Sequence, residues 1–203
     1  MKKVLVFACA MLLFLGMAGI SGATLLDRSG GLIYDDSLDI TWLQDANLAD
    51  TEAFGVSGIE DSGTMTWDTA NNWIAAMNAA TYLGYANWRL PATPGNDSGS
   101  GVIEGEMGHL YSDYGVHASN SGPFTNYPGS GAYWTSNEES SGSAYTWVIG
   151  DGQYIYSKTH ENVYAHAVRN GDVLNPVPEP ATLLLIGGGL SGLIAFRRKF
   201  RKK

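Results

Sequence analysis

Uncharged apolar runs mark both ends of this 203-residue chain, while apolar and polar residues are interleaved in short segments between them. The C-terminal run covers residues 181–196, and six of the seven residues after it are Lys or Arg. A helix of this length reaches about 24 Å, slightly less than the ~30 Å hydrocarbon core of a bilayer, and long basic side chains can extend outward to cover the difference. The pattern predicts a hydrophobic helix with its basic end in the cytoplasm, and a buried core helix is the alternative.

The N-terminal apolar run covers residues 4–20, follows two lysines, and precedes small residues that end at Ala23. This is the pattern of a secretory signal peptide, and it predicts that signal peptidase cuts between Ala23 and Thr24. The only cysteine, Cys9, lies inside the signal, so the exported part has neither a disulfide framework nor a thiol nucleophile. We therefore divide the chain into a signal peptide (1–23), one domain (24–175) and a C-terminal segment (176–203).

The middle of the chain alternates short β-type segments with two helical ones. A helix is expected over residues 66–78, where Thr66 can cap the first turn and apolar residues recur at helical spacing (Trp67, Ala70, Trp73, Ile74 and Met77). Residues 103–111 predict a second, shorter helix. Branched and aromatic residues between turn formers predict strands at 31–35, 39–43, 132–136, 144–149, 153–157 and 163–169, with Asp151-Gly152 as a tight hairpin turn. Helices among antiparallel strands favour an α+β fold.

Charge changes the picture once the two ends are set aside. Residues 24–175 contain nineteen acidic side chains and only four basic ones, a formal charge of −15, although the whole chain carries −8. Such a body repels polyanions, so the composition excludes nucleic acid as a partner.

The C-terminal segment combines three parts in a fixed order: Pro178-Glu179-Pro180, the apolar run, and the basic cluster. In this it resembles the PEP-CTERM sorting signal of bacteria. The resemblance implies a Gram-negative envelope, export across the inner membrane, a transient anchor by the C-terminal helix, and an exosortase-type membrane protease that cuts near the Pro-Glu-Pro motif. It also implies a final place at the outer surface or in the extracellular matrix, in company with exopolysaccharide.

A second resemblance covers about residues 30–173. It rests on short blocks in a fixed order, namely Gly31-Leu32 with Thr41-Trp42-Leu43, Met65-Thr66-Trp67 with Ala70, Asn87-Trp88-Arg89-Leu90-Pro91, Gly105-Glu106-Met107-Gly108-His109-Leu110, Gly122-Pro123-Phe124, Tyr133-Trp134-Thr135-Ser136 and Ala165-His166-Ala167-Val168-Arg169-Asn170-Gly171-Asp172-Val173. These blocks resemble the Lcl C-terminal domain family, which was long a domain of unknown function. The family is similar to C-type-lectin-like folds, and this implies a single lectin-like α+β domain. Two features depart from the family: the body has no cysteine pair, and its charge is opposite to the basic surface through which the namesake domain binds sulfated glycans.

No arrangement of residues for nucleophilic or metal catalysis is recognisable in the sequence, and we expect a protein that is not an enzyme. No serine lies in a G-x-S-x-G elbow, and the histidines lack metal-ligand spacing. Packing is the expected role of His166, a structural hydrogen bond that of His109, and a buried ion pair or carbonyl contact that of Arg89. Two pairs of acids, Glu104/Glu106 and Glu138/Glu139, leave a carboxylate-dependent glycan hydrolase as an alternative.

Two sets of binding candidates remain. Aromatic side chains in or beside loops are candidates for stacking on sugar rings: Phe124, Tyr127, Tyr133 and Trp134. Acidic and amide side chains in the acidic body are candidates for calcium, the one cofactor considered: Asn96, Asp97, Glu138 and Glu139. The sequence thus favours an exported, non-catalytic surface or matrix protein that binds or organises exopolysaccharide, and the alternative is a purely structural matrix scaffold with no discrete ligand.

Overall fold

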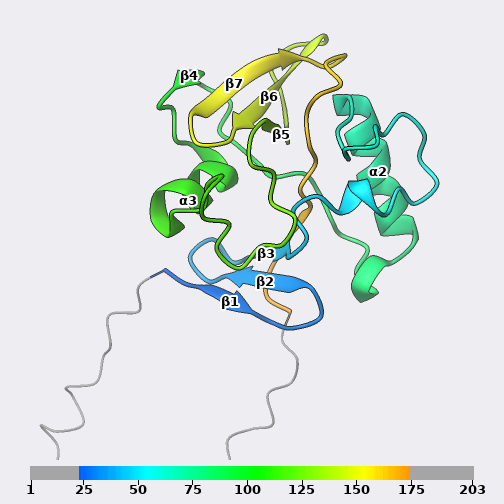
Figure 1. Ribbon diagram of the computed structural model, residues 1–203, viewed down its shortest axis with the longest axis vertical. Helices are drawn as coiled ribbons and strands as arrows, with labels where there is room; N and C mark the ends of the chain where they lie inside the picture. The colour runs from blue at the N-terminus through cyan, green and yellow to red at the C-terminus, as the bar shows by residue number, and fades with distance from the viewer. Residues whose placement is uncertain (1–22, 174–203) are drawn as a thin grey trace, which may run out of the picture.

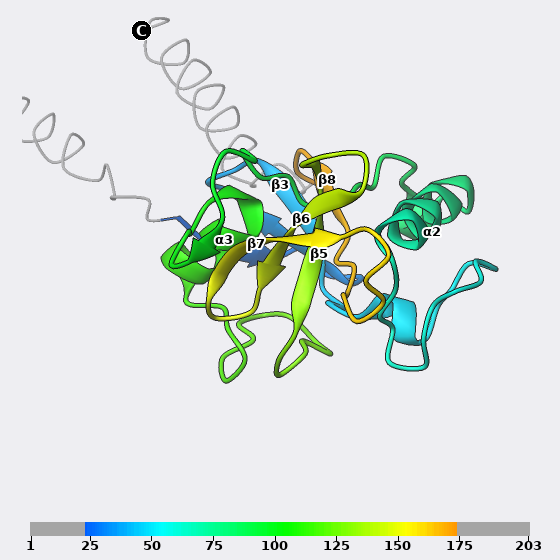
Figure 2. The same cartoon turned by 90° about the horizontal axis from the view of Figure 1, so that it is seen from above.

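The computed structural model describes residues 23–173, so the predicted signal peptide and the predicted sorting helix lie outside the described residues. Within residues 23–173, no helix has both the length and the hydropathy that a membrane span requires. Two antiparallel sheets form the centre of the molecule, and the two α-helices lie on opposite sides of the strands (Figures 1 and 2).

The first sheet is built from both ends of the described chain. Its strand order is β1 (Leu25–Asp27), β2 (Leu32–Asp35), β3 (Ile40–Leu43) and β8 (Val168–Asn170), and all three pairings are antiparallel. β2 and β3 are the hairpin expected from residues 31–43, with Asp35 paired to Ile40 across the turn. β8 adds the last described strand to the edge of β3, so the domain closes where the chain leaves it.

The second sheet has the order β4 (Gly99–Ser100), β7 (Gly152–Ser157), β6 (Ser143–Val148) and β5 (Ala132–Glu138). Strands β5, β6 and β7 confirm the three predicted from residues 132–157. The hairpin turn lies elsewhere than predicted: Gly152 is the first residue of β7 and pairs with Val148, so the turn takes residues 149–151. Gly150 carries the left-handed conformation there (φ +77°), because glycine adopts positive φ without steric cost.

One extended segment, residues 163–170, joins the two sheets. Val163 forms a bridge with Met65, and the Tyr164 amide donates to the Ala132 carbonyl of β5 at 2.8 Å. Val168 then pairs with Trp42 of β3, so the segment runs along the edges of both sheets in turn. The strand predicted at residues 163–169 is therefore only partly regular, because its neighbours change along its length.

The helices follow the sequence pattern closely. α2 (Trp67–Ala79) begins after Thr66, whose hydroxyl accepts a hydrogen bond from the Thr69 amide. Its predicted stripe is buried at Ala70, Trp73, Ile74 and Met77, and only Trp67 is half-buried. α3 (Gly105–Tyr114) confirms the second helix and extends three residues beyond the prediction. Two 3₁₀ turns, η1 (Leu48–Asp50) and η2 (Tyr82–Gly84), complete the helical elements of the described chain.

Two groups of buried side chains hold these layers together. The larger one gathers α2, the start of β5 and residues 88–90, with Trp73 and Trp134 fully buried. The smaller one lies between the first sheet and α3 and includes Trp42, Tyr133 and Met107. Two helices packed on antiparallel sheets make this an α+β domain, as predicted.

Candidate functional site

The aromatic residues expected to contact sugar are largely buried. Phe124 is 4% exposed, and Tyr133 and Trp134 are 0% exposed. The Trp134 indole N–H donates to the Met65 carbonyl at 2.9 Å, deep between α2 and the second sheet. Tyr127 is half-buried against Tyr133, and burial raises the pKa of its hydroxyl. These rings form the core between the sheets, so the stacking platform predicted from them is not exposed in this structure.

The calcium candidates do not assemble into a carboxylate cluster. Glu138 pairs with Lys158 at 2.7 Å, and an Asp97 carboxylate oxygen accepts the Ser98 amide at 2.8 Å. Asn96 and Glu139 are exposed. Over residues 23–173, no group of three or more His, Cys, Asp or Glu side chains is placed to hold a metal ion.

A surface cleft lies beside α3 instead. Its volume is about 450 Å³, within the range of ordinary ligand sites (about 300–1,000 Å³). Residues 92–94, the start of α3 and the turn after β2 supply its walls. Apolar side chains, Leu38, Pro94 and Ile103, line it together with Glu106, His109 and Ser112. Leu38 and Ile103 are 38% and 43% exposed, unusually open for large apolar residues. This cleft could not be predicted from the sequence, because its walls come from three separate segments.

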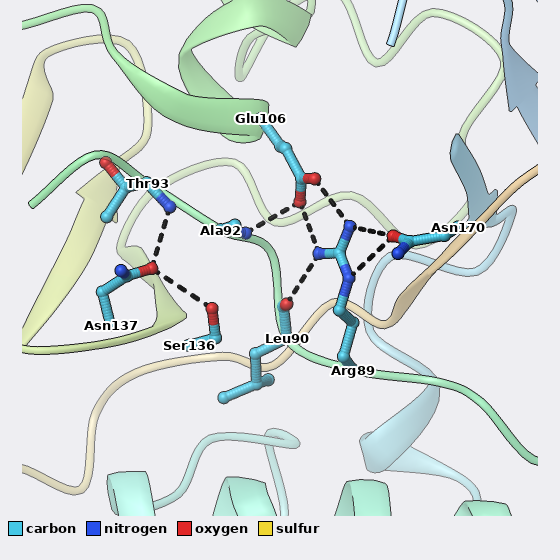
Figure 3. Close-up of polar contacts among 8 residues, drawn as sticks. All are labelled: Arg89, Leu90, Ala92, Thr93, Glu106, Ser136, Asn137 and Asn170. Carbon is cyan, nitrogen blue, oxygen red and sulfur yellow. Dashed lines mark hydrogen bonds and ion pairs between the residues drawn. The ribbon is translucent and has the colours of Figure 1, made fainter. Parts of the chain in front are cut away.

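An ion pair holds Glu106, one of the residues that line this cleft (Figure 3). The Arg89 guanidinium donates from Nη1 and Nη2 to the two carboxylate oxygens of Glu106, each at 2.7 Å. Arg89 also donates to the Leu90 carbonyl and to the Asn170 side chain, and the Ala92 amide donates to Glu106 at 2.7 Å. The predicted ion-pair and carbonyl role of Arg89 is confirmed. Its planar fork joins α3, the segment before the cleft and β8 in one network.

Gly105 allows α3 to approach closely enough for this pair to form. Its φ is +72°, and a Cβ at this position would lie 2.6 Å from the Ala92 carbonyl oxygen. Any side chain there would push α3 away from residues 92–93, so the first glycine of the Gly-Glu-Met-Gly block positions Glu106.

A second polar group lies behind two residues of the cleft lining, Leu38 and His109. The Asp35 carboxylate is fully buried and accepts the amides of Ser37 and Leu38 and the hydroxyl of Tyr114. Burial, together with the Asp35 hydrogen bond, raises the pKa of Tyr114. His109 lies between two acids, with Nδ1 2.7 Å from Asp113 and Nε2 3.6 Å from Asp35. As expected, His109 has a structural partner, which is Asp113, while Asp35 orders the turn that carries Leu38.

His166 is fully buried between the sheets. Its Nε2 lies 2.7 Å from the Leu43 carbonyl, and its ring packs against Trp42, Phe124 and Tyr133. Burial lowers the pKa of His166 to about 4. The packing role predicted for His166 agrees with this position.

Comparison with known families shows which family the domain belongs to. The model of the Lcl C-terminal domain matches residues 31–169. This chain belongs to the Lcl C-terminal domain family. The PEP-CTERM protein-sorting motif matches residues 176–199, and it identifies an exported protein that exosortase processes and sorts to the cell surface. Neither curated proteins nor solved structures gave a match, and the C-type-lectin-like fold stays a prediction.

A smaller cleft of about 320 Å³ lies where the Lcl C-terminal domain ends. Its lining includes Arg28 from the first hairpin, Leu83 and Tyr85 from η2 and the residues after it, and Val173, the last described residue. The Arg169 guanidinium lies 4.2 Å from the centre of the Tyr85 ring. Sequence reasoning missed this surface too, since nothing in the order of residues places η2 beside the end of the domain.

Proposed function

We propose that the exported domain is a non-catalytic component of the cell surface or extracellular matrix, and that its larger cleft binds a segment of exopolysaccharide. The observation that carries the proposal is the open cleft beside α3, whose lining combines apolar and polar side chains. Pyranose rings present C–H faces and hydroxyl groups together, which suits a site lined by Leu38 and Ile103 as well as His109 and Ser112. The sorting motif supports delivery to the cell surface, where such polymers are found.

Charge narrows the ligand class. A body with a formal charge of −15 favours neutral or amino-substituted polysaccharide over sulfated or uronic-acid polymers. This differs from the ligand of the namesake adhesin domain, as the sequence already indicated.

The state of Glu106 supports the non-catalytic part of the proposal. Both of its oxygens accept hydrogen bonds from Arg89, and one of them also accepts from Ala92. A glycosidase acid must give a proton to the leaving group, and its base must accept one from water. A carboxylate held in this way is better suited to support than to proton transfer. If the protein cleaves the host's own exopolysaccharide and Glu106→Gln abolishes this activity, the result would favour the hydrolase alternative.

The test is calorimetric titration of residues 24–175 with fractionated host exopolysaccharide, with and without calcium. Ile103→Asp is expected to weaken binding by about tenfold or more, because it places a charge on the apolar rim. Ile155→Asp is the matched control, since Ile155 is 39% exposed against 43% for Ile103 and lies on β7. Absence of binding both with and without calcium, or an equal loss of affinity in both variants, would contradict the proposal. The alternative would then be a purely structural matrix scaffold.

A further inference from the structure

The last strand of the domain is held in place firmly. Arg28 donates to both carboxylate oxygens of Asp172, at 2.9 and 2.7 Å. The Thr41 hydroxyl donates to the Gly171 carbonyl, and the Gly171 amide donates to Asp39, each at 2.7 Å. Val173, which follows Asp172 directly, is only 5% exposed. The chain is therefore held in the fold up to residue 173, and freeing residues 171–173 would require breaking these contacts.

Little chain separates this fixed end from the motif that the sorting protease recognises. Pro178 follows Val173 by five residues, which span at most about 18 Å when fully extended. A domain of this size has a radius of gyration of about 15 Å and is roughly 40 Å across. The protease must therefore work against the side of the domain where β8 ends. In Figure 1 this side lies near β1 and β2, at the opposite end of the molecule from β7.

That side of the domain carries a strained and exposed leucine. Leu83 lies in the left-handed region (φ 53°, ψ 23°), a conformation that is an outlier for a bulky side chain. Thr81, two residues earlier, is left-handed as well. Burial does not offset this strain, since Leu83 is 40% exposed at the edge of the smaller cleft. Backbone strain of this kind is concentrated at functional sites, and a contact site for a partner is one of them.

We propose that the surface formed by Leu83 and Tyr85 at the smaller cleft docks the sorting protease while the tail is in its active site. The occupant follows from the short connection to the Pro-Glu-Pro motif, which brings the protease against this cleft. Leu83 supplies an apolar contact, and the Tyr85 ring under Arg169 supplies an aromatic one. The surface thus acts as a second recognition element beside the tail, and it is distinct from the cleft on α3.

The test is a pulse–chase measurement of tail removal from the full chain in cells that contain the protease. The test variant is Leu83→Asn, because asparagine tolerates the left-handed conformation better than leucine and keeps the turn intact. Ile155→Asn is the control, with 39% exposure on β7. We expect Leu83→Asn to slow processing about fivefold, the usual effect of losing one apolar interface contact, and Ile155→Asn to leave the rate unchanged. Wild-type processing of Leu83→Asn would overturn the proposal.

A photo-crosslinking residue at position 83 or 155 provides a second measurement that does not depend on the rate. An adduct between position 83 and the protease, without one from position 155, supports docking. An adduct of position 83 with lipid alone, or no adduct, would assign this face to the membrane or to solvent and would overturn the proposal.

Discussion

His166 shows most clearly how a single residue is governed by its surroundings. Its ring is enclosed by Trp42, Phe124 and Tyr133, and Nε2 has its partner in the Leu43 carbonyl. Burial disfavours the charged imidazolium and lowers the pKa of His166 to about 4. The packing role of His166 could be predicted from the sequence, but the burial of Phe124 and Tyr133 beside it could not. These two were expected to contact sugar, and their burial depends on which strands face each other.

The lowered pKa of His166 predicts a pH-dependent stability with a definite sign. The unfolded chain binds a proton near pH 6.5, whereas the folded chain does so only near pH 4. The contribution of neutral His166 to stability is therefore complete above pH 6.5. As the pH falls towards 4, the free energy of unfolding decreases by on the order of 3 kcal/mol. Denaturant unfolding from pH 7.5 to 4 should show this loss in the wild type and a smaller one in His166→Gln. Equal slopes in the two proteins would contradict the account.

At the scale of elements, Arg89 is the side chain that joins three parts of the fold. It bonds Glu106 on α3, Leu90 in its own segment and Asn170 on β8. An ionic role for this arginine could be predicted, because an arginine among aromatic residues in an acidic body needs a partner. Its partner could not, since seventeen residues and a glycine-dependent approach of α3 separate it from Glu106.

A double-mutant cycle tests this network. Arg89→Met should lower the free energy of unfolding by about 2 kcal/mol, because it leaves the Glu106 carboxylate, only 15% exposed, with the Ala92 amide as its remaining donor. Adding Glu106→Gln removes that unpaired charge, so the double variant should recover part of the loss.

The free energies of unfolding from urea titrations of the four proteins give the coupling energy, which we expect to exceed 1 kcal/mol in magnitude. Effects of the two substitutions that simply add would show that the pair is not a connection between α3 and β8.

The sequence predicted local elements better than their assembly. The helix after Thr66 was predictable because its cap and its apolar stripe are both local, and the hairpin of β2 and β3 for the same reason. Residues 163–170 were predicted as one strand, but they exchange partners between two sheets, and those partners are distant in sequence. Both clefts were missed, since Leu38, Leu83 and Ile103 carry no sequence mark of exposure.

At the scale of the whole molecule, an acidic domain lies between the N-terminal segment that we predict to be a signal peptide and the PEP-CTERM sorting motif. The domain carries nineteen of the twenty acidic residues, while eight of the twelve basic ones lie outside it. The sorting motif begins three residues after the last described one, so the segment that directs sorting follows closely on the end of the domain. The account depends on the domain acting outside the cell after both segments have been removed.

Intact-mass spectrometry of the protein recovered from the cell surface or extracellular material tests this claim most directly. The account predicts a chain that begins at Thr24 and ends near the motif at residues 178–180, without the basic cluster. Recovery of the complete chain from Met1 to Lys203 as the functional form would contradict it.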